Sequence, residues 1–142
     1  MSLTKGRCQC GGVEFTVNGP LRDVVYCHCK MCRRLTGHLV AATACAPSHL
    51  SIDRSGTLRW YASSAEASRG FCGNCGSNLF WKPAGGGHIS IWAGALDEPT
   101  GIKAAAHIYV EAKGDYYTID DGLPQHIGGE HDVRLPATPA AG

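Results

Sequence analysis

The sequence predicts one β-dominated domain made of many short strands and a single brief helix. Short runs in which apolar and polar residues alternate recur along the chain, and clusters rich in Gly, Pro, Asn and Ser separate them. Such a pattern is typical of all-β domains. A length of 142 residues suits one core that buries about two-thirds of the surface of the unfolded chain, so no second domain is needed.

The first strand is expected at residues 13–17. Val13, Phe15 and Val17 alternate there with polar residues, and a period of two with β-branched and aromatic side chains indicates a strand with one buried face. The turn-forming sequence at 18–20 ends it. A short strand at 23–26 then leads to the densest cysteine cluster.

The one helix is expected at residues 30–36, which contain good helix formers and stop at Gly37, a residue typical of helix C-termini. A loop is expected at 63–68. From Gly128 onward Gly, Pro and Ala dominate, so we expect 128–142 to be a flexible C-terminal tail. Further short strands are expected at 38–44, 50–53, 58–61, 79–82, 88–93, 104–110 and 116–119.

The composition also excludes classes of partner. A formal net charge of +1 argues against a nucleic-acid surface, which needs clustered Lys and Arg. No segment approaches the roughly 20 apolar residues of a membrane span, and the N-terminus lacks the basic and apolar regions of a signal peptide. We therefore expect a cytoplasmic protein without a nucleic-acid or membrane partner, while the oligomeric state is not indicated by any of these features.

Seven of the eight cysteines fall into three clusters with the spacing of metal ligands. In a reducing compartment such cysteines are more often metal ligands than disulfides, and residues as close as a C-x-C pair reach disulfide geometry only with strain. The clusters are Cys8-x-Cys10, Cys27-x-Cys29-x-x-Cys32 and Cys72-x-x-Cys75.

Counting ligands assigns different roles to these clusters. Structural zinc sites have four protein ligands, whereas catalytic sites have three and leave one position open. The two outer pairs supply four thiolates, so they predict a structural zinc that closes a long loop and supports folding. The central cluster supplies three, which predicts a catalytic zinc and two zinc ions per chain. Alternatively, His28, Cys45 or another side chain completes the central set, which would make it a second structural site.

Several other residues are candidates for the site. Arg33 and Arg34 follow the third central thiol and can hold substrate carboxylates, or one or both face water. His28 is a poor co-ligand in an extended segment but a possible pocket residue. The remaining candidates are expected to have structural roles. We expect Cys45 to be a buried thiol, His107 to pack in the core or form a hydrogen bond, and Arg69 to stabilise the fold. The tryptophans are expected to pack in the core or to form a pocket wall, Asp120-Asp121 to lie in a solvated turn, and His88, His126 and His131 to be exposed.

Three ordered cysteine motifs give the chain a resemblance to a known family. Gly6-x-Cys8-x-Cys10-Gly11, Cys27-His28-Cys29-x-x-Cys32-Arg33-x-x-Thr36-Gly37 and Arg69-x-Phe71-Cys72-x-x-Cys75-Gly76-Ser77 resemble the glutathione-dependent formaldehyde-activating enzyme family, also described as centromere protein V-like. The later Gly94-x-Leu96-Asp97-x-Pro99 and His107-Ile108-Tyr109-Val110 fit it too. The resemblance covers about residues 6–125.

The resemblance implies a zinc-stabilised β-tent fold of short antiparallel strands, with residues 6–125 as the zinc-binding domain. It implies a structural zinc on Cys8, Cys10, Cys72 and Cys75 and a catalytic zinc on Cys27, Cys29 and Cys32. The implied activity is that of a carbon–sulfur lyase, which condenses a small thiol such as glutathione with formaldehyde or a related aldehyde.

Two other functions remain open at this point. A non-enzymatic, zinc-stapled module would bind a protein partner and would have a closed central cluster. A reductase like the methionine-R-sulfoxide reductases, which share the β-tent, would need a free reactive cysteine, and only Cys45 is outside the clusters.

Overall fold

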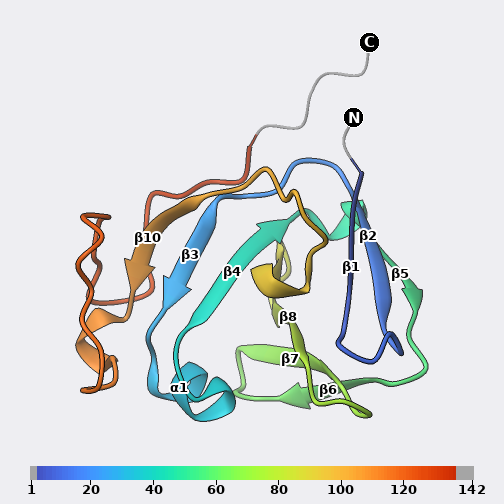
Figure 1. Ribbon diagram of the computed structural model, residues 1–142, viewed down its shortest axis with the longest axis horizontal. Coiled ribbons are helices and arrows are strands. Elements are labelled where there is room, and N and C mark those ends of the chain that lie inside the picture. The colour runs from blue at the N-terminus through green and yellow to red at the C-terminus, as the bar shows by residue number, and fades with distance from the viewer. Residues whose placement is uncertain (1–2, 137–142) are drawn as a thin grey trace.

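The computed structural model describes residues 3–136 and consists of two β-sheets and one short α-helix (Figure 1). The predicted β-dominated class with a single brief helix is therefore confirmed. The strands are β1 (Leu3–Arg7), β2 (Glu14–Asn18), β3 (Val24–Cys27), β4 (Val40–Cys45), β5 (Leu50–Arg54), β6 (Leu58–Ala62), β7 (Ala67–Cys72), β8 (Asn78–Pro83), β9 (Ile89–Trp92) and β10 (Ala104–Ile108). The helix α1 spans Lys30–Thr36, and 3-10 turns occur at Pro47–His49, Ala93–Ala95 and Val110–Ala112.

The smaller sheet has the order β1-β2-β5 and is antiparallel throughout. Its central strand β2 shows the predicted alternation, because Phe15 and Val17 are buried while Thr16 between them is partly exposed. Strand β1 was not predicted, since its sequence has no alternating apolar residues. Its edge position explains this, because β1 pairs with β2 through the backbone and buries only Gly6.

The larger sheet has the order β10-β3-β4-β9-β8-β7-β6. All neighbours are antiparallel except β10 and β3, which are parallel. The sequence analysis also missed β7, which begins inside the expected loop and pairs with β6 and β8. At Gly70 of this strand a side chain would be crowded, because a Cβ there would lie 3.1 Å from the rings of both Phe80 and Trp60. This packing between strands is not visible in the local sequence.

The prediction of a strand at residues 116–119 is wrong. These residues form a turn and irregular backbone, and the bridge to His107 on the outer edge of β10 is made by Gln125 instead. The backbone N–H of His107 donates to Pro124, and His126 donates back to His107. Because the edge position is taken, the aromatic residues of 116–119 pack on side chains rather than pair as a strand.

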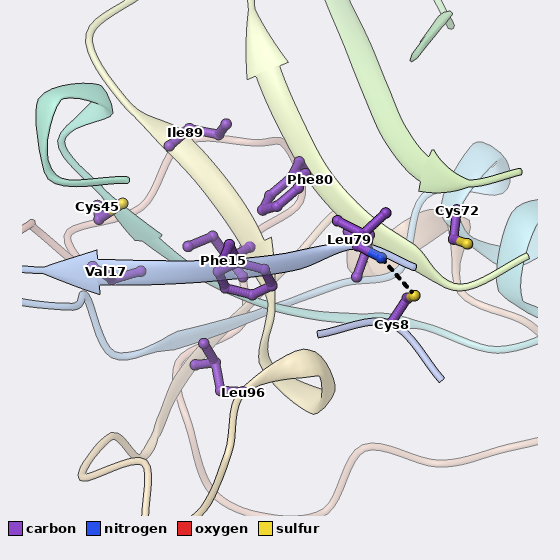
Figure 2. Packing of buried hydrophobic residues seen from close by; sticks show 11 residues of the cluster. Cys8, Phe15, Val17, Cys45, Cys72, Leu79, Phe80, Ile89 and Leu96 are labelled. Atoms are coloured by element: carbon purple, nitrogen blue, oxygen red, sulfur yellow. Dashed lines mark hydrogen bonds between the residues drawn. The ribbon is translucent and has the colours of Figure 1, made fainter. Parts of the chain in front are cut away.

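The core lies between the two sheets (Figure 2). Phe15 of the smaller sheet meets Phe80 of the larger one, with ring centroids 5.1 Å apart in an edge-to-face arrangement. Leu79 and Ile91 are fully buried beside them. Cys45 is also fully buried in this cluster, so the expectation that it is a buried thiol is confirmed.

Strand alternation gives the two faces of the larger sheet different roles. On β9, Ile89 and Ile91 point into the core, whereas Ser90 and Trp92 line a cavity. On β4, Ala42 faces the cavity and Cys45 the core. The cavity thus lies on the sheet face opposite the main core.

The segment after β10 returns along the larger sheet, drawn from orange to red in Figure 1. The part of the expected tail at 128–136 has a defined course, in which Tyr109 N–H donates to the carbonyl of Gly128 and several residues line the cavity. The rest of the expected tail, 137–142, lies outside the described residues. Among residues 3–136 no helix is long and apolar enough to cross a membrane.

Candidate functional site

The two outer cysteine pairs meet at one place, which we call the four-cysteine cluster. Their sulfur atoms all lie within 4.8 Å of one another. One pair lies in the turn between β1 and β2, and the other follows from the end of β7. The residues are Cys8, Cys10, Cys72 and Cys75.

Backbone amides point at these sulfurs. Val13 N–H donates to Cys8 Sγ at 3.3 Å, and the amides of Asn74 and Cys75 each donate to Cys72 Sγ at 3.4 Å. The Cys8 contact is the dashed line in Figure 2. Amides that donate to sulfur stabilise its thiolate form, as metal binding requires.

The turn after Cys72 and two nearby hydroxyl groups also support the thiolate form of this cluster. Gly76 has φ +82°, a left-handed conformation that favours glycine, and its N–H donates to the carbonyl of Cys72 at 2.8 Å. The hydrogen bond with the Ser77 hydroxyl, above all, lowers the pKa of Cys75 to about 5. Thr57 is the chief cause of the lowered pKa of Cys72.

The geometry of the four sulfurs fits zinc. A tetrahedron with zinc–sulfur bonds of about 2.3 Å has sulfur–sulfur edges of about 3.8 Å. The Cys8–Cys10 and Cys10–Cys72 sulfur separations are both 3.7 Å.

The second cluster, the three-cysteine cluster, forms where β3 passes into α1. Cys27 ends β3, Cys29 is the N-cap of α1, and Cys32 lies in its first turn. Their sulfurs also lie within 4.8 Å of one another, with Cys27 and Cys32 3.4 Å apart. The helix predicted at 30–36 is confirmed, with Gly37 as a left-handed C-cap at φ +82°.

No fourth protein donor joins this cluster among the residues that the structure describes. His28 turns away from it, because Nδ1 is hydrogen bonded to Tyr117 and Nε2 to His107. Cys45 lies in the core on the other sheet face. The alternative of a four-ligand central site completed by either residue is therefore not what the geometry shows.

Electrostatics favour one thiolate, at Cys29, in the three-cysteine cluster, while the pKa values of Cys27 and Cys32 are raised. Hydrogen bonds from Cys27 and then Cys32 hold the pKa of Cys29 well below its usual range, and the same interaction raises the pKa of Cys27. The Arg69 guanidinium lies 3.8 and 3.9 Å from Cys32 Sγ through its two terminal nitrogens. The cluster can thus carry a thiolate beside a buried cation.

The three-cysteine cluster opens into a cavity of about 1140 Å³. All three cysteines line it, and so do the buried side chains of Arg22 and Arg69. Members of the four-cysteine cluster are not among its lining residues. The two clusters therefore adjoin different spaces: all three sulfur-bearing residues of the three-cysteine cluster line the large cavity, whereas the four-cysteine cluster contributes only Cys8 to a separate pocket of about 420 Å³.

The three residues proposed for substrate contact do not line this cavity. His28 is buried, Arg33 is half-buried and Arg34 is exposed. Arg22 takes a cavity position instead, and the only sequence signal for it is a basic residue two positions before the strand β3. Arg69, expected to brace the fold, contacts the cluster itself.

A hydrogen-bond chain that runs from the exposed Asp121 through the buried His107 holds His28, which is not among the residues that line the cavity. Asp121 Oδ2 lies 2.8 Å from His107 Nε2, His107 Nδ1 lies 2.8 Å from His28 Nε2, and His28 Nδ1 lies 2.6 Å from Tyr117 Oη. The expectation of a hydrogen bond for His107 is confirmed. Burial, above all, lowers the pKa of His28 to about 4. The pKa of Asp121 is lowered by the Leu123 amide and by His107.

When both histidines are neutral and Asp121 is ionised, these hydrogen bonds allow one set of donors and acceptors. An ionised Asp121 only accepts, so His107 carries its proton on Nε2 and accepts at Nδ1. His28 then donates from Nε2 and accepts the Tyr117 hydroxyl proton at Nδ1. The segment between Cys27 and Cys29 is thereby anchored through its middle residue. Asp120 and Asp121 are exposed, as expected for a solvated turn.

Comparisons with known proteins find a matching family model, a similar sequence and a similar fold. A family model described as glutathione-dependent formaldehyde-activating enzyme matches residues 3–112. An uncharacterized lyase of Schizosaccharomyces pombe is 28% identical over 116 residues, which cover 80% of this chain and 82% of that protein. A crystal structure of a Rhodobacter sphaeroides protein is similar with a TM-score of 0.58 and 23% identity, covering 85% of this chain and 98% of that chain. The last likeness concerns the fold alone.

Proposed function

This chain belongs to the glutathione-dependent formaldehyde-activating enzyme family, and we propose that it is a zinc-dependent carbon–sulfur lyase that joins a small glutathione-like thiol to formaldehyde or a related aldehyde. One observation carries the proposal. The three-cysteine cluster lines a large cavity, and no fourth protein ligand accompanies it among the described residues. An incomplete ligand set beside a cavity is typical of a catalytic metal site.

In this proposal each cluster holds one zinc ion. The four-cysteine cluster would hold a structural zinc, and Cys27, Cys29 and Cys32 would hold the catalytic one, within a zinc-binding domain of residues 6–125. The donor chemistry fits, because thiolates favour zinc and the sulfurs of each set already converge. When bound at the open set, zinc supplies a lowered pKa for a coordinated thiol, and hence a thiolate near neutral pH.

The protein's own groups then position the reactants. The substrate sulfur attacks the aldehyde carbon, the new carbon–sulfur bond forms, and the carbonyl oxygen gains the proton that the thiol lost. Arg69 Nε and Trp92 Nε1 are buried N–H donors from cavity-lining side chains that have no partner among residues 3–136. Both atoms have almost no accessible surface, so in this proposal the Arg69 guanidinium acts through its charge beside Cys32 on the oxygen where negative charge develops.

In this proposal the rest of the cavity orients the thiol and the aldehyde relative to each other. Its floor includes the small or apolar side chains of Val25, Val40 and Ala42, which favour a defined position for a ligand over bulk water. Holding a thiol and a carbonyl together removes much of the entropic cost of a two-molecule reaction.

The two other functions are less well supported. A binding module would not need a cavity beside an incomplete ligand set. A reductase would need a reactive free cysteine, yet Cys45 is fully buried in the core and burial raises its pKa to about 11.

The test combines metal analysis with exchange NMR. Wild-type protein should hold two zinc ions and accelerate the exchange between glutathione and its formaldehyde adduct above the spontaneous rate. Cys29→Ser should remain folded, retain the structural zinc and lose the acceleration by at least about 10²-fold, since it removes a group at the reacting centre. Cys45→Ala is the matched control outside both clusters and should retain the acceleration.

Two results would contradict the proposal. One is a wild-type protein that holds two zinc ions but does not accelerate adduct formation for any of the small thiols tested. The other is a folded Cys29→Ser protein with unchanged acceleration.

A further inference from the structure

The cavity has a second charged region, far from the three-cysteine cluster along β3. Cys27 ends this strand, while Arg22 lies just before its start and is only 8% exposed. Five residues at about 3.3 Å each separate their Cα atoms by about 16 Å. Val25 and Ala42 line the cavity floor between them, so one elongated space connects the cluster with Arg22.

Three further basic residues gather around Arg22. His88 and His131 both line the cavity, and each has a pKa lowered first by burial and next by the positive charge of Arg22. Arg134 also lines the cavity, and its Nη1 donates to the carbonyl of His131 at 3.0 Å. The sequence predicted exposed positions for His88 and His131, but both are half-buried.

This basic group has no carboxylate partner among residues 3–136, where the one contact between a basic side chain and a carboxylate within 4.0 Å is His107–Asp121. Glu66 is the single carboxylate among the cavity-lining residues described, and it is exposed. Asp132 acts on His131 but is exposed and forms no ion pair within the described part of the chain.

Arg22 itself is held in place with donors to spare. Its Nε donates to the Asp23 carbonyl at 3.2 Å and its Nη2 to the Ala42 carbonyl at 2.9 Å. The described residues offer no acceptor for Nη1. A buried guanidinium held by neutral carbonyls lacks the counter-charge that stabilises such a group, and a ligand anion would provide it through charge-assisted hydrogen bonds.

We propose that Arg22, His88, His131 and Arg134 form a subsite for a carboxylate of the thiol substrate. This deepens, and rests on, the proposed function of the three-cysteine cluster as the site for the sulfur. An extended peptide spans about 3.3–3.6 Å per residue, so a thiol of two or three residues, together with the reach of the Arg22 side chain, connects the two regions. Free cysteine carries its sulfur and carboxylate on one residue and is too short for both.

The binding experiment uses S-methylglutathione, which has the carboxylates of glutathione but no free thiol. Calorimetry with the zinc-loaded full chain should show binding to wild type and an affinity at least about tenfold lower for Arg134→Ala and for the double variant His131→Ala/Arg134→Ala. Arg54→Ala, an exposed arginine on β5, is the matched control and should bind as wild type does. The dimethyl ester of S-methylglutathione should bind weakly and equally to all four proteins.

Arg22→Gln extends the test to the buried member. Because Arg22 also donates to the Ala42 carbonyl, the thermal unfolding of Arg22→Gln is measured first. If Arg22→Gln does not fold, Arg134→Ala and His131→Ala/Arg134→Ala decide the question. The proposal is overturned if wild type does not bind S-methylglutathione, if those two variants bind it as wild type does, or if the ester binds as tightly as the acid.

The outcomes separate this subsite from the lyase proposal. Charge-dependent binding of S-methylglutathione without any acceleration of adduct formation would support the subsite and contradict the lyase. Acceleration with a KM for glutathione that is unchanged in His131→Ala/Arg134→Ala would support the lyase and contradict the subsite.

Discussion

Replacement of Cys72 by Ser should unfold the protein. Cys72 is fully buried at the end of β7, and its sulfur lies 3.7 Å from that of Cys10, 62 residues earlier in the chain. The residue therefore connects the smaller sheet to the larger one. A hydroxyl at this position is a poor zinc ligand and leaves two amide donors without their thiolate acceptor.

The free energy of unfolding that Cys72→Ser is expected to lose is large compared with the total stability of an ordinary domain. A cross-link that closes a loop of 62 residues contributes about 4 kcal/mol in the loop-entropy model used for disulfides. Structural zinc binding in small domains amounts to about 10–16 kcal/mol at neutral pH, whereas the total stability of a typical domain is about 5–15 kcal/mol. The zinc-binding figure is as large as the whole stability of such a domain, and the loop-closure figure alone is about a quarter to four-fifths of it.

The measurement is zinc content by mass spectrometry together with circular dichroism, thermal unfolding and gel filtration. The expected Cys72→Ser protein has lost the structural zinc and the cooperative transition, while Cys29→Ser, its counterpart at the three-cysteine cluster, retains both. A monodisperse Cys72→Ser protein with the wild-type unfolding midpoint would refute the structural role of the four-cysteine cluster.

Three further predictions follow from other contacts. Cys45 should resist iodoacetamide at pH 8 in the folded protein, because burial raises its pKa to about 11; mass spectrometry that finds it alkylated without unfolding would contradict its place in the core. Arg69→Gln should slow adduct formation by about 10²-fold with zinc content unchanged, and an unaltered rate would exclude Arg69 from the reaction. Asp121 has a lowered pKa, so its ionised form stabilises the fold above the unfolded pKa of about 3.9 and this stabilisation is lost as the pH falls through the folded value. Asp121→Asn should therefore be less stable than wild type in urea unfolding at pH 7, with the difference shrinking in acid, whereas equal stability at pH 7 would show that the chain through His107 contributes nothing.

Local patterns in the sequence were enough for the β-rich class, the helix at 30–36 and the membership of both cysteine clusters. Each depends on residues within a few positions of one another. The alternation of Phe15 and Val17 predicts a buried strand face, and Gly37 predicts the end of a helix. The C-x-C and C-x-x-C spacings place two sulfurs in one turn whatever the rest of the chain does. The convergence of the outer pairs followed from ligand number, because zinc requires four donors at a closed site.

Contacts between distant residues decided what the sequence could not. Strand β7 pairs with β6 and β8, and its Gly70 leaves room for the rings of Trp60 and Phe80 on those strands. Residues 116–119 are not a strand because Gln125 takes the edge of β10. The sequence pointed to Arg33 and Arg34 beside the cysteines, whereas the sheet brings Arg22 and Arg69 into the cavity.

The sequence by itself thus determined which residues can hold metal, since metal ligands need only local spacing and a total count. Only the tertiary structure decided which cluster has access to the cavity of about 1140 Å³. Access depends on which face of the larger sheet carries Cys27 and which carries Cys45, and on where the segment at 128–136 returns over that face. These are properties of strand register and packing between residues far apart in the chain, and no local pattern encodes them.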